Sequence, residues 1–388
     1  MGSTRSNRSP KILGLALAFC GVVAFIASET TSSNQSAKLS ASPYPAAQEN
    51  ANRQAKEWLG RGIPGLALAV ALDGKIVYSE GFGYADLEER VPVWPTTKFR
   101  IGSVSKPLTA TALMQLVEAG KVDLDSPVQK YVPTFPDKGA VITVLMVAGH
   151  LGGIRHYQAD EFHIQRHYAK VLEGLKIFEN DPLVAAPGTK FSYSSYGYNL
   201  LSAVVESAAG EDFLSYMQQR VFAPLGLVHT TADQNTQIVE QRSRFYELPK
   251  DGAVENAPYV DNSYKWAGGG FLSTAEDLVH FGSALLEPGF LKQETLRTMF
   301  TSQKRTMFTS QKTKSGEETG YGIGWAVHKS KSGKLIYGHS GGSVGGTSQL
   351  ILYPETHLVV AMVNNLSNGP WKREEVEAVA EEFAGKAR

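Results

Sequence analysis

The alternation of apolar and polar positions divides this chain into strand-like ends and a middle with helical periodicity. Near the amino end, Gly65–Leu72 and Lys75–Gly81 are short strand-like runs joined by Asp73-Gly74, a dipeptide typical of tight hairpins. Near the carboxyl end, four consecutive runs have the same character: Gly324–Lys329, Leu335–His339, Thr347–Tyr353 and His357–Asn364. We therefore expect strands at both ends of the folded part of the chain.

Apolar residues recur at helical spacing in the segments between and beside these strands. The clearest predicted helices are Gln48–Gly60, Leu200–Ala209, Phe213–Phe222, Thr274–Leu286 and Lys372–Ala384. The order strands, helices, antiparallel strands, helix predicts an α+β fold, with an antiparallel sheet assembled from both chain ends and flanked by helices. Residues from about 143 to 260 are interpreted as a mostly helical subdomain inserted into this sheet.

One further helix is predicted within Arg100–Gly120, and two candidate catalytic residues lie at its amino end. Pro107 has no N–H and is tolerated only in the first turn of a helix, so the helix begins near Ser103. Ser103 and Lys106 are three positions apart, which places their side chains on one face with Cβ atoms about 5–6 Å apart. A helix amino end and an adjacent cation both favour an alkoxide, so Ser103 is a candidate nucleophile.

Composition excludes several classes of function. The chain has 388 residues with 38 basic and 38 acidic side chains, so the formal net charge is zero and nucleic acid is not an expected partner. Cys20 is the single cysteine, so neither disulfides nor thiol chemistry are expected in the folded part. No phosphate loop or dinucleotide-binding pattern is present, and no cofactor is expected.

The first 27 residues are typical of a targeting segment. Arg5, Arg8 and Lys11 precede a 16-residue apolar run at 12–27, which suits a signal peptide or a short membrane anchor. A linker follows, so we divide the chain into a targeting or anchor segment with linker at 1–42 and a folded domain at 43–388. The protein is expected to be exported or tethered to a membrane.

A perfect tandem repeat interrupts the predicted helix–strand order near the carboxyl end. The eight residues Arg297–Lys304 are repeated at once as Arg305–Lys312. A solenoid needs several such units, so we interpret this repeat as a duplication tolerated in a surface loop.

The pair Ser103 and Lys106 is a weak signal alone, but two further motifs accompany it. One is Tyr193-Ser194-Ser195, and the other is His339-Ser340-Gly341 between two strand-like runs. A serine–lysine pair, a tyrosine and a strand with a polar–small–glycine step form the three-part pattern of penicillin-recognising serine enzymes.

With these motifs the chain resembles the class C beta-lactamase and penicillin-binding-protein-like superfamily, and within it the serine beta-lactamase-like proteins of mitochondria. Four further segments resemble that family, and the likeness extends from about residue 60 to 365: EGFGYADLEERVP at 80–92, EAGKVDLDSPVQKYVPTFP at 118–136, GHLGGIRHY at 149–157 and PYVDNSYKWAGGGFLST at 258–274. The resemblance implies a beta-lactamase/transpeptidase-like fold. It also implies filament formation, and a place in the mitochondrial intermembrane space for a eukaryotic protein or in the periplasm or outside the cell for a bacterial one.

The resemblance also implies roles for individual residues. Ser103 would be the acylated nucleophile, Lys106 would take its proton, and Tyr193 would pass a proton to the leaving group. A tyrosine can do this near neutral pH only if cations lower its pKa, and Lys106 is the expected cation. The backbone N–H groups of Ser103 and Gly342 would form an oxyanion hole, with Ser340 and Gly341 beside it on the same strand.

Two positions depart from the superfamily pattern. Ser195 stands where the superfamily usually has asparagine, so a contact to a substrate amide is altered. His339 stands where beta-lactamases have lysine, and a neutral imidazole holds a substrate carboxylate less firmly than an ammonium. Both departures favour a peptidase, with esterase and true beta-lactamase as alternatives, and a filament-forming scaffold with little catalysis as a further one.

Three other features of the sequence bear on this interpretation. Gly338–Gly342 fits the G-x-S-x-G pattern of a nucleophile elbow with Ser340 as nucleophile, but a strand, not a helix, is expected after it. His163 and His167 are four positions apart but lack the glutamate of a zinc peptidase, so no metal is expected. His150 is interpreted as structural.

Overall fold

The computed structural model describes residues 2, 42–250, 252–287, 289–301 and 320–385. The chain divides into residues 1–41 and residues 42–388, and only the second of these units is described below. The apolar run at 12–27 and the second copy of the repeat at 305–312 lie outside the described residues. Within the described residues, no helix is both long and apolar enough to cross a membrane.

An antiparallel sheet of eight strands is built from both ends of the chain, in the order β3-β2-β1-β13-β12-β11-β10-β9. The two ends meet where β1 pairs with β13, with Leu66 opposite Asn364. The sheet confirms the predicted α+β fold and its assembly from both ends of the chain. The strands are β1 Gly65–Leu72, β2 Lys75–Asp86, β3 Val91–Pro92, β9 Gly320–Tyr321, β10 Ala326–Lys329, β11 Leu335–Ser343, β12 Gly346–Tyr353 and β13 Leu358–Asn364.

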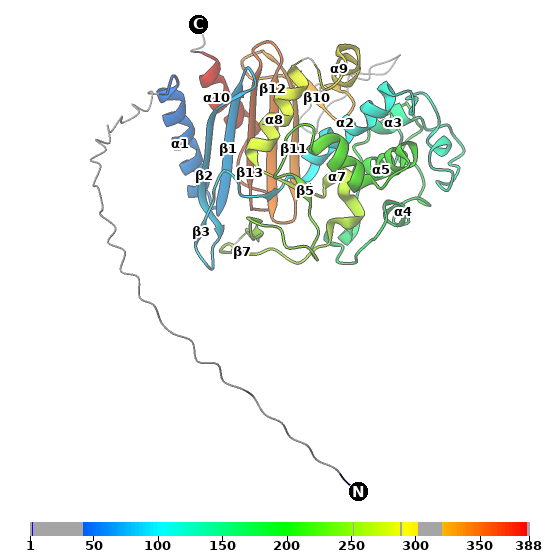
Figure 1. The fold of residues 1–388 in the computed structure, drawn as a ribbon, viewed down its shortest axis with the longest axis horizontal. Helices are drawn as coiled ribbons and strands as arrows, with labels where there is room; N and C mark the ends of the chain where they lie inside the picture. The colour runs from blue at the N-terminus through cyan, green and yellow to red at the C-terminus, as the bar shows by residue number, and fades with distance from the viewer. Residues whose placement is uncertain (1, 3–41, 251, 288, 302–319, 386–388) are drawn as a thin grey trace, which may run out of the picture. The chain divides into compact units, whose positions relative to one another are not determined.

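Helices cover both faces of this sheet, so the central strands β1 and β13 are buried at every position (Figure 1). Along β1, Leu66 and Leu68 point to one face and the small residues Ala67 and Ala69 to the other. Small side chains let a helix approach closely. In α8 a Cβ added at Gly282 would lie 2.6 Å from Val359 Cγ1 of β13. The covering helices are α1 Pro45–Gly60 and α10 Arg373–Ala384 on one face and α8 Ala275–Leu286 on the other.

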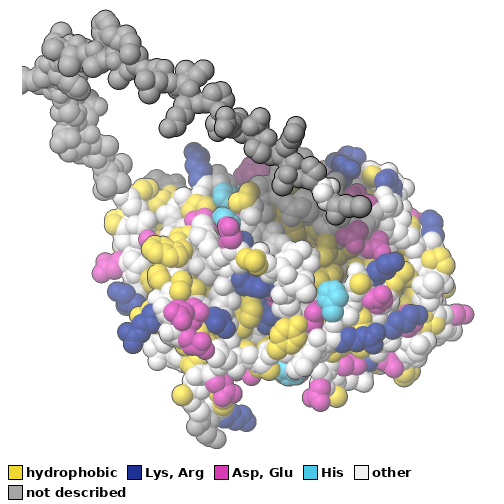
Figure 2. Space-filling view, turned by 60° about the horizontal axis from the view of Figure 1, so that its bottom comes forward, with side chains coloured by type: hydrophobic (Ala, Val, Ile, Leu, Met, Phe, Trp, Pro, Cys, Tyr) yellow, Lys and Arg dark blue, Asp and Glu magenta, His cyan; other side chains and the backbone are white. Residues whose placement is uncertain are grey.

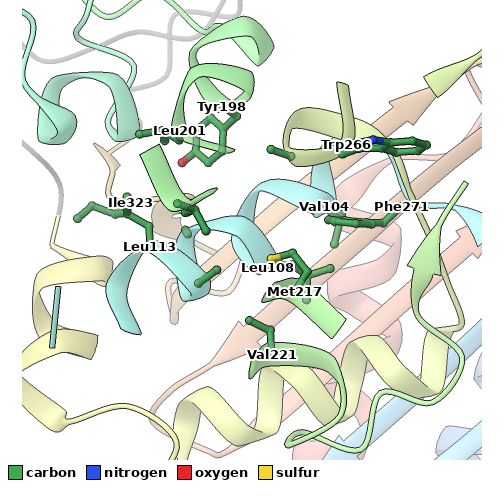
Figure 3. Packing of buried hydrophobic residues seen from close by; sticks show 14 of the residues in the cluster. Val104, Leu108, Leu113, Tyr198, Leu201, Met217, Val221, Trp266, Phe271 and Ile323 are labelled. Atoms are coloured by element: carbon green, nitrogen blue, oxygen red, sulfur yellow. The ribbon is translucent and has the colours of Figure 1, made fainter. Parts of the chain in front are cut away.

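The predicted helix around Pro107 is confirmed, and a tighter turn precedes it. Gly102–Val104 forms a 3₁₀ turn, η1, that leads directly into α2, Ser105–Glu118. Pro107 lies in the first turn of α2, where a missing N–H costs no helical hydrogen bond. Leu108 and Leu113 of α2 pack among buried side chains from several helices (Figure 3). This packing fixes the position of the residues at the amino end of α2.

Helices are the main regular elements between residues 143 and 260, and loops connect them. α5, Ser195–Ala209, is the longest of these helices and lies against α2. The others are α3 Val144–Ala148, α4 Val171–Leu175, α6 Phe213–Tyr216 and the π-helical turn η4 Met217–Phe222. A short helix, α7 Trp266–Gly269, lies between α2 and α5. His150 and His156, in the loop that follows α3, pack on Tyr193 in the loop that precedes α5.

The first copy of the tandem repeat is partly helical. Its residues Arg297–Phe300 end α9, Gln293–Phe300, where Met299 and Phe300 are buried. The Phe300 ring stacks on Tyr337 of β11 with a centroid distance of 4.0 Å. The interpretation as a surface loop is therefore wrong for this described part of the repeat, because these side chains pack on the sheet.

Charged side chains of both signs are interspersed over the face shown in Figure 2. This distribution agrees with the zero formal net charge of the chain.

Candidate active site

A cleft of about 430 Å³ lies between the sheet and the loop-rich region, and Ser103 lines it. Gly102 has φ +47°, and a Cβ added there would lie 2.5 Å from the carbonyl oxygen of Gly342. Only glycine allows this approach of η1 to β11. The other lining residues described are His156, Tyr157, Phe162, His163, Ser195, Glu247, Lys265, Gly268, Gly269, Gly342, Ser343, Ser367 and Asn368.

Lys106 is fully buried beneath Ser103. Its Nζ lies 2.8 Å from Ser103 Oγ, 2.9 Å from Ser195 Oγ and 2.7 Å from the Gly268 carbonyl oxygen. Burial and the nearby cation of Lys265 hold the pKa of Lys106 well below its usual value. A neutral amine suits these partners, because it donates to the carbonyl and retains a lone pair that accepts a hydroxyl proton.

Tyr193 joins this group from the loop that precedes α5. The Lys106 Nζ lies 4.8 Å from the centroid of the Tyr193 ring, and Ser103 and Ser195 lie close enough to the phenol to influence its pKa. The structure thus brings Ser103, Lys106, Tyr193 and Ser195 together, as the sequence motifs predict.

The protonation state of Tyr193 differs from the expectation drawn from the sequence. The sequence motifs predict a neighbouring ammonium that lowers the pKa of the phenol. Instead burial raises the pKa of Tyr193, and the hydrogen bonds to Ser103 and Ser195 offset this rise only in part. The expectation is wrong because Lys106 is itself desolvated and contributes no stabilising charge.

Two histidines hold the backbone around Tyr193, and the sequence motifs did not single out either for this purpose. His150 accepts hydrogen bonds on both sides of Tyr193: its carbonyl oxygen from Ser192 N at 2.8 Å, and its Nδ1 from Ser194 N at 3.2 Å. Its ring also packs on the Tyr193 ring with a centroid distance of 4.4 Å. His150 therefore has the structural role of holding Tyr193 in position. His156 Nδ1 accepts from Ser195 N at 3.2 Å.

His339 on β11 faces Tyr193, but it is buried and neutral. Its Nδ1 lies 2.6 Å from the carbonyl oxygen of Ser340, and since a carbonyl only accepts, Nδ1 carries the proton. Its Nε2 therefore accepts from the Tyr321 hydroxyl at 2.9 Å. Burial and the nearby Lys106 lower the pKa of His339 to about 3. His339 therefore offers no positive charge to a substrate at neutral pH.

Residues 338–342 form a continuous strand and not a nucleophile elbow. They belong to β11 and pair with β12, with Ser340 opposite Gln349 and Gly341 opposite Ser348. Gly341 lies against η1, since a Cβ added there would lie 1.9 Å from the Ile101 carbonyl oxygen. The strand–turn–helix geometry that Ser340 needs as a nucleophile is absent from this part of the described chain.

Lys265 is a second buried lysine in the cleft, and the sequence motifs did not single it out. It is 2% exposed, and its Nζ lies 4.3 Å from the centroid of the Phe162 ring. Burial lowers its pKa to about 7. The sequence feature that could have indicated this lysine is its place in the segment NSYKWAGGG, three positions before glycines that lie near Ser195 and η1.

His163 and His167 do not form a pair. His163 ends the 3₁₀ turn η3, Ala159–His163, whereas His167 lies in the following loop with its Nδ1 3.1 Å from Asp261 Oδ2. Within the described ranges, no three His, Cys, Asp or Glu side chains gather as metal ligands.

Comparisons with known proteins show the family to which the chain belongs. The profile of the family described as Beta-lactamase matches residues 47–384. The mitochondrial serine beta-lactamase-like protein LACTB of Homo sapiens is 36% identical, covering 78% of this chain and 71% of its own. The putative penicillin-binding protein PbpX of Bacillus subtilis is 30% identical, covering 69% of this chain and 62% of its own.

Solved structures give the same result. An octameric penicillin-binding protein homologue from Pyrococcus abyssi superposes with a TM-score of 0.72 at 28% identity, covering 87% of this chain and 76% of its own. The D-amino acid amidase from Ochrobactrum anthropi SV3 superposes with a TM-score of 0.73 at 25% identity, covering 87% and 96%. With a profile match over most of its length, the chain belongs to the beta-lactamase family of serine hydrolases, in which it is similar to the LACTB proteins.

Proposed function

We propose that this protein is a serine hydrolase that acts through an acyl-enzyme on Ser103, with peptide bonds as its preferred substrates. One observation supports the proposal above all. Lys106 Nζ lies 2.8 Å from Ser103 Oγ, and no carboxylate among the described residues pairs with this lysine. A buried amine without a counter-ion is poised to accept a proton, which is what a serine nucleophile requires.

Acylation then proceeds with a defined path for each proton. Ser103 Oγ attacks the scissile carbonyl carbon, and its proton moves to the lone pair of Lys106 Nζ. The bond to the leaving nitrogen or oxygen breaks, and the leaving atom takes the proton of the Tyr193 phenol. The proton held by Lys106 then returns to Tyr193, whose ring Lys106 contacts, so that amine and phenol regain their starting states. Water attacks the acyl-enzyme by the reverse sequence.

The raised pKa of Tyr193 suits this role. A phenol that stays protonated in the free enzyme is a donor for the leaving group and not the initial base. The backbone N–H groups of Ser103 and Gly342 are the proposed donors to the oxyanion, in keeping with the close approach of η1 and β11. Such donors commonly contribute ~10²–10³ in rate each.

Neutral His339 is the reason to prefer peptides over beta-lactam antibiotics. An ammonium at this position would attract the carboxylate of a beta-lactam, whereas His339 has a pKa of about 3 and donates its one ring proton to the Ser340 carbonyl. The solved relative named as an amidase supports amide bonds as substrates. Esterase activity remains the alternative, since the same acyl-enzyme serves both.

Hydrolysis by the wild type and by Ser103→Ala tests the proposal. We expect the wild type to cleave members of a fluorogenic peptide library, and Ser103→Ala to lose at least ~10³-fold in kcat/KM. Thermal melting of both proteins shows whether the fold is intact. Hydrolysis of a cephalosporin faster than of any peptide would overturn the preference. Unchanged activity in Ser103→Ala would overturn the acyl-enzyme.

We also propose that the protein acts in mitochondria and self-associates. The first proposal is supported by the similarity to LACTB proteins named as mitochondrial, and the second by the solved relative described as octameric. Light scattering of residues 42–388 over a range of concentrations tests self-association. A monomer at all concentrations would contradict it, and assembly without hydrolysis would favour the filament-forming scaffold.

A further inference from the structure

The position that usually carries asparagine in this superfamily holds Ser195, so the donor that asparagine would offer a substrate amide is missing. The Ser195 hydroxyl does not replace that donor. It accepts a hydrogen bond from Lys106 Nζ at 2.9 Å, and it lowers the pKa of the neighbouring Tyr193 and Tyr157 phenols. Ser195 Oγ is therefore already engaged by the lysine that contacts Ser103.

His156 stands beside this position and lines the same cleft as Ser103 and Ser195. Its Nδ1 is 3.2 Å from the backbone nitrogen of Ser195. A backbone N–H only donates, so Nδ1 accepts and carries no proton. A neutral imidazole with an unprotonated Nδ1 has its proton on Nε2.

The neutral form is favoured by the surroundings of this ring. Burial is the main cause that lowers the pKa of His156 to about 4; the neighbouring Lys106 and Lys265 act in the same direction, and Glu161 opposes them. The ring is also fixed in orientation. It lies edge-on to Tyr193 with a centroid distance of 5.5 Å and packs on Tyr157 at 4.4 Å.

The remaining nitrogen is not used within the described part of the protein. No described residue accepts a hydrogen bond from His156 Nε2, and the half-buried ring borders the cleft. A fixed N–H donor beside a nucleophile, with no partner in the described chain, is suited to a substrate acceptor.

From these contacts we infer that His156 Nε2–H binds an amide carbonyl oxygen on the acyl side of the substrate, in place of the missing asparagine. The inference rests on the proposed function, since it concerns the substrate that acylates Ser103. It names the substrate class as acyl donors that carry an N-acyl group on the α-carbon beside the scissile carbonyl, such as N-acylated amino acid esters and peptides. It makes His156 a residue that determines specificity.

Two esters of equal chain length provide the test. The p-nitrophenyl ester of N-acetylglycine has the second carbonyl, and p-nitrophenyl pentanoate has methylenes in place of the amide. In wild type we expect a higher kcat/KM for the N-acetylglycine ester. In His156→Asn the asparagine oxygen retains an acceptor near the Nδ1 position, while the Nε2–H donor is lost. We expect kcat/KM to fall about 10-fold for the N-acetylglycine ester and less than 2-fold for the pentanoate.

His156→Gln is the matched control, because it loses the acceptor for Ser195 N–H. We expect it to slow both esters alike, since Ser195 and Tyr193 are then held less firmly. An alkyl fluorophosphonate, which has no amide carbonyl, reports whether Ser103 is reactive in each protein. If His156→Asn labels at the wild-type rate yet slows both esters equally or neither, the inference is wrong. If the wild type itself is not labelled, the proposed function fails instead.

Discussion

The two walls of the cleft hold their functional groups by different means. On the sheet wall, His339 and Gly342 belong to a strand that pairs along its length with β12, and the central strands are buried on both faces. On the loop wall, Tyr193 and Ser195 depend on a few hydrogen bonds to His150 and His156. The sheet wall is therefore stabilised by apolar burial and the loop wall by specific polar contacts. Substitutions in the two walls should differ in how they affect stability and activity.

The largest effect is expected at Lys106, where the two walls meet. Lys106→Ala removes the proposed base and the group that contacts both Ser103 and Ser195. We expect kcat/KM to fall ~10³-fold, within the range that a general base contributes. Kinetics on the folded variant measure this loss. A variant that retains native activity would show that another group takes the Ser103 proton.

Shortening a buried side chain in the sheet should lower the free energy of unfolding without changing kcat of the folded protein. Leu352 of β12 is fully buried under α8, close to Gly282. Leu352→Ala should cost about 2–5 kcal/mol of unfolding free energy by removing buried methyl groups and leaving a cavity. Urea unfolding measures the loss. A fall in kcat of the folded variant would contradict the idea that packing in the sheet wall affects stability alone.

A substitution on the loop wall should affect stability and activity together. The Arg155 guanidinium binds Glu161 at 2.7 Å and Asp181 at 2.5 Å, while its carbonyl oxygen accepts from Ser194 Oγ at 2.6 Å. Arg155→Met should cost about 1–3 kcal/mol, since Asp181 is partly exposed to solvent. It should also lower kcat more than Leu352→Ala does. Equal kcat in the two variants would contradict the distinction between the walls.

Acid should lower the stability of the folded protein, and the histidines of the loop wall should contribute to this loss. Burial lowers the pKa of His156 to about 4 from the usual 6.5, and the pKa of His150 shifts in the same direction. In the unfolded chain His156 therefore binds a proton near pH 6.5, whereas in the folded protein it binds one only near pH 4. Stability is then full above pH 6.5 and falls as the pH drops from 6.5 to 4.

Thermal melting at a series of pH values checks this dependence. We expect Tm to be lower at pH 4.5 than at pH 7, and the slope to be smaller in His156→Asn. A Tm that is constant or rises over this interval would contradict the neutral, acceptor state of these histidines.

The smallest effect is expected at Tyr321, within the sheet wall. Tyr321→Phe removes the hydroxyl that donates to His339 Nε2 at 2.9 Å. The strand still fixes His339 through its backbone pairing, so we expect a cost of about 1 kcal/mol and only a few-fold change in kcat/KM. A loss as large as that of Arg155→Met would show that polar contacts matter equally on both walls.

The sequence predicts the sheet wall better than the loop wall, and the reason is physical. Hydrophobic alternation and Asp73-Gly74 indicate the β1–β2 hairpin, and Pro107 indicates the start of α2, because these signals act between near neighbours. The spacing of Ser103 and Lys106 on one helix likewise predicts their contact. β11 extends to Ser343, beyond the predicted end at His339, because glycine and serine positions pair with β12 without apolar alternation.

Contacts between distant residues could not be predicted in this way. His150 and His156 are 44 and 39 positions from the backbone groups that they accept from, and no periodicity links them. The buried state of Lys265 depends on how three aromatic rings assemble around it. The pKa of Tyr193 follows from burial in the folded protein, which a motif does not contain.

Covalent trapping tests the central claim most directly. Treatment with a fluorophosphonate followed by intact mass and peptide mapping should give one adduct per chain, on the peptide that contains Ser103. Labelling should slow sharply in Lys106→Ala, whose amine no longer takes the serine proton. An adduct on the peptide that contains Ser340, or no adduct in protein with a native melting curve, would contradict the account.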